Sequence, residues 1–172
     1  IKQGLVDVET MFSLMNVAPD VQDVPGAKTL QVGKGEIEFD NVCFSYDPAR
    51  NILKNVSFKV PAGSKTAIVG PSGAGKYTIP RIIYRFYNRA SGEIRIDGQN
   101  IAKARQDSLR AAIGMVPQDT VLFNDTVLYN IGYGRPDASR EEIIEAAKMA
   151  QVHDFVMHLP EGYEAIVGER GL

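Results

Sequence analysis

Two glycines and a lysine between positions 70 and 76 have the spacing of a phosphate-binding loop. Gly70, Gly75 and Lys76 fit the pattern G-x-x-x-x-G-K, which follows an apolar run at 67–69 and precedes a helix-like stretch that continues to about Tyr87. Glycines let backbone N–H groups converge on phosphate oxygens, a helix N-terminus adds partial positive charge, and the lysine can reach the terminal phosphates. The residues expected to contact phosphates are Gly70, Pro71, Ser72, Gly73, Ala74, Gly75, Lys76, Tyr77 and Thr78.

The residue after the lysine departs from this pattern. A short Ser or Thr hydroxyl usually binds Mg²⁺ there, whereas this chain has Tyr77, whose hydroxyl lies much farther from its backbone. Thr78 has suitable chemistry, but one step along a helix turns its side chain by about 100°. Pro80 removes a backbone donor and clashes with the carbonyl of Lys76, at a typical cost of about 3 kcal/mol inside a helix. We therefore expect weakened binding of Mg²⁺-bound phosphates.

Alternating apolar and polar residues predict antiparallel β-structure on either side of the loop. The alternation runs through 37–46 and again through 56–60, where turn residues end it. Residues 92–98 predict a third strand that ends in an Asp97-Gly98 turn.

The remaining periodicities indicate an α/β fold. Short apolar runs at 67–69 and 113–116 suit buried strands. Ser139 with Glu142 three residues later predicts a capping box that opens a helix through about Ala150. Strands alternating with helices are typical of α/β domains.

The first 34 residues are expected to lie outside this domain. Apolar residues at three- and four-residue spacing between Leu5 and Met15 predict the end of an amphipathic helix, and the segment after it reads as a linker. No apolar run approaches the roughly 18 to 20 residues that span a bilayer. The domain itself is expected over 35–172.

Composition excludes some classes of function. The net charge of −2 and the absence of a basic cluster argue against nucleic-acid binding. The single cysteine, Cys43, cannot form an internal disulfide and fits a reducing compartment. His153 and His158 are five residues apart, so they are expected to be surface or packing residues. Tyr84, Phe86 and Tyr87 are expected to pack in the core.

With the loop in place, further segments resemble the nucleotide-binding domain of ABC exporters. Residues 44–46 resemble the family's A-loop, which implies that Tyr46 stacks on adenine. Residues 116–119 resemble the Q-loop, which implies that Gln118 senses Mg²⁺ and water and contacts the membrane domain. Residues 167–171 resemble the segment before the signature motif, which touches the membrane domain's intracellular loops. The implied ligands are ATP and Mg²⁺, with Lys76 and Gln118 as catalytic residues and Gln118 and Thr78 as metal ligands.

The finer resemblance is to subfamily B half-transporters of the mitochondrial and heavy-metal-tolerance type. Residues 23–27, 92–99 and 117–125 are most similar to the porphyrin and heavy-metal branch, with iron-sulfur-related exporters as near neighbours. This resemblance implies a RecA-like P-loop NTPase core, an antiparallel β subdomain and the start of a helical subdomain. It also implies a homodimer, a membrane domain on the same polypeptide, ATP-driven export and an organellar location.

The chain stops at Leu172, where the family's signature motif would begin, so we expect negligible hydrolysis by this chain alone. Residues 94–98 mimic a Walker B strand, but Arg95 interrupts it and the turn interpretation is favoured. Three alternatives remain: a nucleotide-binding regulatory module without catalysis, another P-loop enzyme such as a small-molecule kinase, and an interaction fragment that binds no nucleotide.

Overall fold

A computed structural model describes residues 8–9, 11–13, 17–47 and 49–168 of the chain. The chain forms two compact units, Ile1–Gly114 and Met115–Leu172, and each is described by itself. In the first unit, Val8, Glu9 and the residues from Met11 to Ser13 are helical, and 17–36 contain no strand or helix. Among the described residues, no helix is both long and apolar enough to cross a bilayer.

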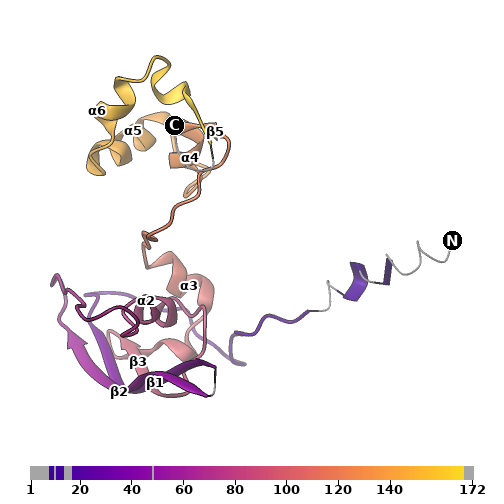
Figure 1. The fold of residues 1–172 in the computed structure, drawn as a ribbon, viewed down its shortest axis with the longest axis vertical. Coiled ribbons are helices and arrows are strands. Elements are labelled where there is room, and N and C mark those ends of the chain that lie inside the picture. Colours follow the sequence, from indigo (N-terminus) through magenta and orange to yellow (C-terminus); the bar gives the residue numbers. More distant parts are fainter. Residues whose placement is uncertain (1–7, 10, 14–16, 48, 169–172) are drawn as a thin grey trace. The chain divides into compact units, whose positions relative to one another are not determined.

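The first unit is built on an antiparallel sheet of four strands in the order β2-β1-β3-β4. Strand β1 (Ile37–Asp47) pairs with β2 (Arg50–Val60) on one side and β3 (Ser91–Ile96) on the other, and β3 pairs with β4 (Gln99–Asn100). Figure 1 shows α2 (Thr78–Ile83) and α3 (Gln106–Ala111) against this sheet, with η1 (Ile101–Lys103) following β4. The predicted antiparallel strands are therefore confirmed.

The core of the first unit lies between the sheet and these helices. Phe39, Val42 and Phe44 of β1 are 2% exposed or less, with a register shift between Phe39 and Val42 that interrupts strict alternation. Ile82 of α2 and Leu109 of α3 are equally buried. The Phe39 and Phe58 rings stack with centroids 4.4 Å apart across the β1–β2 pair. Burial of such side chains contributes about 1.5–3 kcal/mol each relative to exposure, so the sheet-helix contact is the main source of stability.

The turn at Asp97 and Gly98 is confirmed. Both residues have positive φ, 48° and 75°, and they join β3 to β4, so the Walker B interpretation of this segment is excluded. The Asp97 carboxylate also accepts hydrogen bonds at 2.8–3.0 Å from the backbone N–H groups of residues 33–36. These bonds, with Gly35 and Glu36 contributing most, hold the Asp97 pKa far below its ordinary value.

The prediction of buried strands at 67–69 and 113–116 is wrong for this structure. Residues 67–69 and 113–116 have no strand pairing, and Val69 and Val116 are 87% and 93% exposed. The only parallel pairing among the described residues is a single bridge between Lys28 and Ala104. A central strand of a parallel sheet needs neighbours on both sides, and the described residues supply none for either run.

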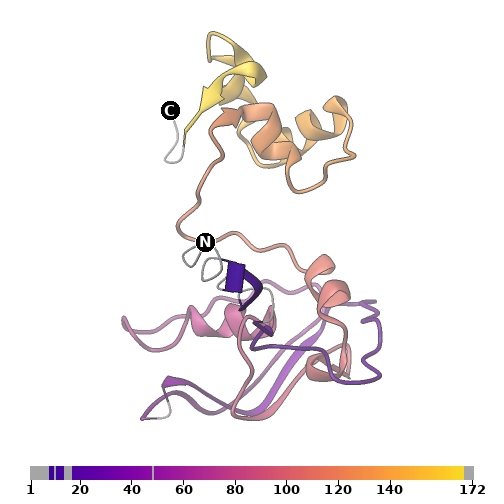
Figure 2. The ribbon, with the colours of Figure 1, turned by 90° about the vertical axis from the view of Figure 1, so that its right-hand side faces the viewer.

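The second unit combines short helices with a two-stranded ladder. Strand β5 (Asp125–Thr126) pairs with β6 (Ile166–Val167), beside α4 (Val127–Gly132), α5 (Arg140–Met149), α6 (His153–Met157) and η2 (Gly162–Glu164). Figure 2 shows the ladder next to these helices. The core of the second unit consists of Ala147, Val156 and Tyr163. The predicted capping box of Ser139 and Glu142 is confirmed, with both reciprocal hydrogen bonds present.

The histidines occupy the structural positions expected from the sequence. Nδ1 of the half-buried His153 lies 2.9 Å from the Tyr163 hydroxyl. Nδ1 of the exposed His158 lies 2.6 Å from the Asp154 carbonyl oxygen. No group of three or more potential metal ligands occurs within the described ranges.

Candidate nucleotide-binding site

Tyr46 lies near the end of β1 and keeps 46% of its surface exposed. Its ring makes perpendicular contacts with Phe44 and Tyr87, with centroids 4.7 and 5.0 Å away. Its hydroxyl lies 3.3 Å from Oγ1 of Thr78, a hydrogen bond in which either hydroxyl can donate. The residue predicted to bind adenine is thus held next to the predicted phosphate loop while its ring stays accessible.

The loop from Gly70 to Tyr77 has a backbone that requires glycine at two positions. Gly73 and Gly75 have φ of +79° and +87°, which side-chain-bearing residues rarely adopt. A Cβ on Gly75 would also lie 3.0 Å from side-chain carbons of Ile52 and Leu53, so the loop packs closely on β2. Positive φ at Gly73 and Gly75, but not at Ala74 between them, gives the alternating backbone whose N–H groups can form an anion-binding concavity.

The ammonium group of Lys76 lies over this loop. Its Nζ donates hydrogen bonds of 2.7 Å to the carbonyl oxygens of Gly70 and Pro71. A flexible lysine held only by two carbonyls can exchange them for phosphate oxygens, which form stronger charge-assisted hydrogen bonds.

The helix after the loop begins later than the sequence pattern indicated. Tyr77 is the N-cap residue of α2 and makes no side-chain capping bond, and Thr78 is the first helical residue. Pro80 is therefore the third helical residue, in the first turn, where a backbone N–H has no intrahelical partner in any case. The expected cost of about 3 kcal/mol for an interior proline is thus wrong for this helix, because the helix starts where Pro80 is tolerated.

The predicted metal position offers no short free hydroxyl. Tyr77 is 61% exposed, while Thr78 is 4% exposed and hydrogen-bonded to Tyr46. Gln118 lies in the second unit, on an exposed segment without regular structure. The structure brings Tyr46 into contact with Thr78, two residues after Lys76, and Gln118 belongs to the other unit.

Two residues near the site were not predicted. Arg85, two residues after α2, is 4% exposed and donates to the carbonyls of Gln22 and Ala104 at 3.0 and 2.6 Å and to the Asp23 carboxylate at 3.1 Å. Tyr87 was expected in the core but is 42% exposed beside Tyr46, and the same expectation is wrong for Phe86, which is 46% exposed. Nothing in the sequence indicated that Arg85 is buried, since arginine is mostly exposed in folded proteins.

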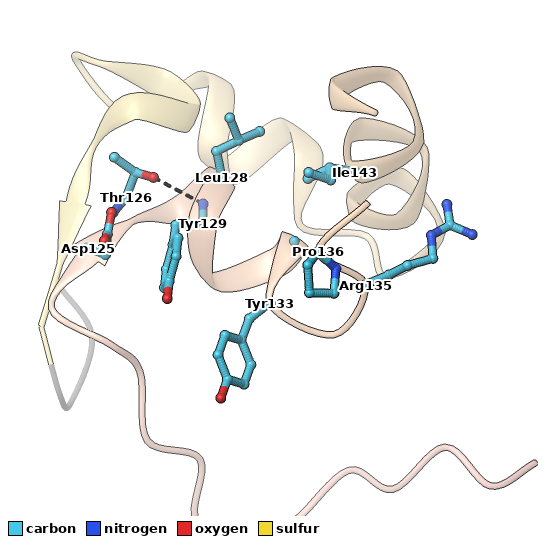
Figure 3. Close-up of a pocket in the computed structure, with 9 residues that line it drawn as sticks. Asp125, Thr126, Leu128, Tyr129, Tyr133, Arg135, Pro136 and Ile143 are labelled. Carbon is cyan, nitrogen blue, oxygen red and sulfur yellow. Dashed lines mark hydrogen bonds between the residues drawn. The ribbon is translucent and has the colours of Figure 1, made fainter. Parts of the chain in front are cut away.

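A second concave site lies in the second unit. Figure 3 shows the rings of Tyr129 and Tyr133 on the same side of α4, bordering a cavity of about 490 Å³. Phe123 completes an aromatic cluster, its ring centroid 4.4 Å from that of Tyr133. The Asn130 amide holds Phe123 through hydrogen bonds to its backbone N–H and C=O of 2.8 and 3.1 Å. All three rings are about half exposed.

Comparison with known proteins places these features in a family. Residues 53–167 match the model of the ABC transporter family. The whole chain is 57% identical to an ATM1-type heavy metal exporter of Novosphingobium aromaticivorans. It is 53% identical to a mitochondrial iron-sulfur clusters transporter of Aspergillus fumigatus and 54% to the human ATP-binding cassette sub-family B member 6. The chain spans only 28%, 24% and 20% of these three relatives, respectively.

A solved structure also supports membership in the ABC transporter family. The fold matches the structure of a bacterial Atm1-family ABC exporter with ATP bound, with a TM-score of 0.93 and 57% identity over 99% of this chain and 30% of that one. The match covers the glycine loop, Tyr46 and the second unit together. The chain therefore belongs to the ABC transporter family, and its sequence is that of a nucleotide-binding domain of the Atm1 and sub-family B type, a P-loop NTPase domain that binds ATP.

Proposed function

We propose that this chain is the ATP-binding part of an ABC exporter, with residues 1–34 as the end of a membrane-domain helix and its linker. The observation that carries the proposal is the position of Lys76, whose Nζ lies 2.7 Å from two carbonyls of a loop with positive-φ glycines. The β- and γ-phosphates of ATP replace these carbonyls as partners of Lys76. Residues Gly70 to Thr78 surround the phosphates, and adenine stacks on Tyr46.

Lys76 and Gln118 take the catalytic roles in the complete transporter. Lys76 neutralises charge on the terminal phosphates, and Gln118 is the Mg²⁺- and water-sensing residue. Mg²⁺ fits this set of residues poorly, because Tyr77 replaces the short hydroxyl and the Thr78 hydroxyl is bound to Tyr46. Gln118 and Thr78 remain the candidate metal ligands, and we propose that this domain binds Mg-ATP more weakly than its relatives do.

In the complete cassette, residues 67–69 and 113–116 are strands of a parallel, RecA-like sheet. Their apolar side chains support this proposal, since Val69 and Val116 are almost fully exposed within this chain. Pairing with further strands would cover them and satisfy their backbone groups.

The parent protein couples ATP binding and hydrolysis to transmembrane export. The names of the relatives support heavy-metal, porphyrin or iron-sulfur-related conjugates as its cargo. Its partners are its own transmembrane domain and a second copy of the cassette in a homodimer, with no role for nucleic acid. The location is a mitochondrial or other organellar membrane, with the cassette in a reducing soluble compartment.

The aromatic cluster of Phe123, Tyr129 and Tyr133 is the surface that the parent's own membrane domain contacts. Half-exposed rings around an open cavity are typical of interaction sites. The ladder of β5 and β6 brings Val167, from the segment similar to the family's intracellular-loop contact, next to Asp125 at the rim of this cavity. In the full-length parent, Tyr133→Ala should uncouple ATP hydrolysis from transport, whereas Phe155→Ala, equally exposed on α6, should not.

A catalytically inactive regulatory module is the alternative, favoured by Tyr77 at the usual position of the metal-binding hydroxyl. Thermal unfolding with and without nucleotide tests the central proposal. ATP should raise the unfolding midpoint of the chain in a concentration-dependent manner, and Lys76→Ala should reduce the shift at each ATP concentration. Equal midpoints with and without millimolar ATP would show that this chain binds no nucleotide.

A further inference from the structure

We infer that Tyr87 is a positioning residue for the base subsite, whose ring holds Tyr46 in the orientation that stacks on adenine. The inference rests on the proposed function, because it deepens the description of that same site. It starts from the finding that Tyr87, expected in the core, stands 42% exposed beside Tyr46.

Three rings meet at the base subsite. Tyr46 is perpendicular to both Phe44 and Tyr87, with centroids 4.7 and 5.0 Å away, and Phe44 and Tyr87 are themselves 5.9 Å apart. Edge-to-face contacts at such distances are the preferred geometry of aromatic pairs. Phe44 is 2% exposed and belongs to the core, so its ring is a fixed contact for Tyr46. The half-exposed Tyr87 is the second ring that restrains Tyr46.

The backbone around Tyr87 is fixed from both sides. Arg85 has φ of 55°, which reverses the chain after α2, and its buried guanidinium donates to the Ala104 carbonyl at 2.6 Å. On the other side, the N–H of Ala90 donates to the carbonyl of Cys43 in β1 at 2.9 Å. A segment tied to the domain at both ends can present a side chain in a constant position.

The neighbouring aromatic residues are engaged elsewhere. The rings of Tyr84 and Phe86 contact each other at 4.9 Å, and the Arg110 guanidinium lies 5.6 and 5.7 Å from them. Of the three aromatic residues after α2, Tyr87 is therefore the one that reaches Tyr46. Phe86 offers a matched control, since it has a similar exposed fraction, 46%, in the same segment.

Loss of Tyr87 should weaken base binding while phosphate binding persists. An unrestrained Tyr46 ring must be ordered each time a base stacks on it, so Tyr87→Ala should lower the affinity for ADP roughly three- to tenfold. Affinity for inorganic tripolyphosphate, which has no base, should stay within about twofold. Tyr87→Phe keeps the aromatic ring and should restore ADP affinity, and Phe86→Ala should leave both affinities unchanged.

The experiment is a calorimetric titration of the full chain and these variants with ADP and with tripolyphosphate. If Tyr87→Ala does not fold, as judged by circular dichroism, Tyr87→Leu keeps the apolar volume without the aromatic face and takes its place. Equal ADP affinity in wild type and variant would overturn the role of Tyr87, as would an equal loss for tripolyphosphate. A wild-type chain that binds neither ligand would instead overturn the proposed function.

Discussion

The hydroxyl of Tyr46 lies 3.3 Å from Oγ1 of Thr78, so the residue at the proposed base subsite contacts the first residue of the helix that follows the phosphate loop. Thr78 is 4% exposed, and its hydroxyl is engaged by this contact. The base and phosphate subsites are thus directly connected, and the hydroxyl nearest the usual metal position already has a partner.

Substitution of Tyr46 separates the contribution of its ring from that of its hydroxyl. Tyr46→Ala should weaken ADP binding by about 1–3 kcal/mol, the usual contribution of base stacking on an aromatic side chain. Tyr46→Phe keeps the ring and loses the contact with Thr78, so its effect should be below about 1 kcal/mol. Calorimetric titration measures both, and an alanine variant that binds ADP as well as wild type would exclude adenine stacking on this residue.

Tyr77→Ser should create a dependence on Mg²⁺ that the wild-type chain lacks. A serine hydroxyl at this position is short enough to serve as a metal ligand. The affinity for ATP should therefore rise at least several-fold when Mg²⁺ is added to the variant and change little for wild type. Tyr77→Phe is the control, since it removes the tyrosine hydroxyl without supplying a short one. If serine and phenylalanine variants respond to Mg²⁺ alike, Tyr77 does not determine metal binding.

Arg85→Met should destabilise the first unit and release the linker. The arginine side chain is 5% exposed and pairs with Asp23 at 3.1 Å. Its removal takes a donor from the Gln22 and Ala104 carbonyls and leaves Asp23 with only the Gln106 N–H as a donor. We expect a loss of about 2–4 kcal/mol in the free energy of unfolding. We also expect faster proteolysis between Val17 and Asp23. Arg81→Met, at an exposed position on α2, should change neither the free energy of unfolding nor the rate of proteolysis. Equal stability of the two variants would contradict the conclusion that Arg85 ties the linker to the first unit.

Asp97 should make stability depend on pH in the acid range. Its pKa is depressed by the N–H groups of Gly35, Glu36, Lys34 and Gly33, in that order of importance. The contribution is therefore complete above its unfolded pKa of about 4 and is lost as the pH falls through the lower folded value. Asp97→Asn tolerates the positive φ but replaces one acceptor oxygen by an NH2 donor, so it should unfold at lower temperature than wild type at pH 7.

The difference between wild type and Asp97→Asn should shrink steadily below about pH 4. Thermal unfolding monitored by circular dichroism between pH 2 and 7 measures this difference in unfolding midpoint. Asp137→Asn, an exposed loop position in the second unit, is the control. A difference that stays constant over this range would show that the four backbone hydrogen bonds do not favour the ionised carboxylate.

Local sequence patterns predicted an element correctly where the contacts that form it lie within a few residues. Alternation in 37–46 predicted β1, and the Ser139–Glu142 spacing predicted the start of α5, because strand faces and helix caps depend on residues within a few positions. The glycine loop was predicted from its spacing and Tyr46 from the resemblance to the family's A-loop, and their roles in binding nucleotide stay predictions.

Features that depend on distant neighbours were not predictable in this way. The apolar runs at 67–69 and 113–116 indicate burial, but burial requires partner strands that the described residues do not contain. Arg85 is buried because the carbonyl oxygens of Gln22 and Ala104, which are far apart in the sequence, both accept hydrogen bonds from its guanidinium group. Its φ of 55° also breaks helical periodicity, so spacing alone could not show that Tyr87 faces Tyr46 while Phe86 faces Arg110.

Titration of the chain with a fluorescent ATP analogue in the absence of Mg²⁺, beside Lys76→Ala, tests the central claim most directly. We predict saturable binding at one site per chain that unlabelled ATP displaces. The alanine variant should bind more weakly by about 1.5–3 kcal/mol, since it lacks the charge-assisted hydrogen bonds of the ammonium group. No saturable binding by the wild-type chain, or equal affinity of the two proteins, would contradict the assignment of this loop as the ATP site.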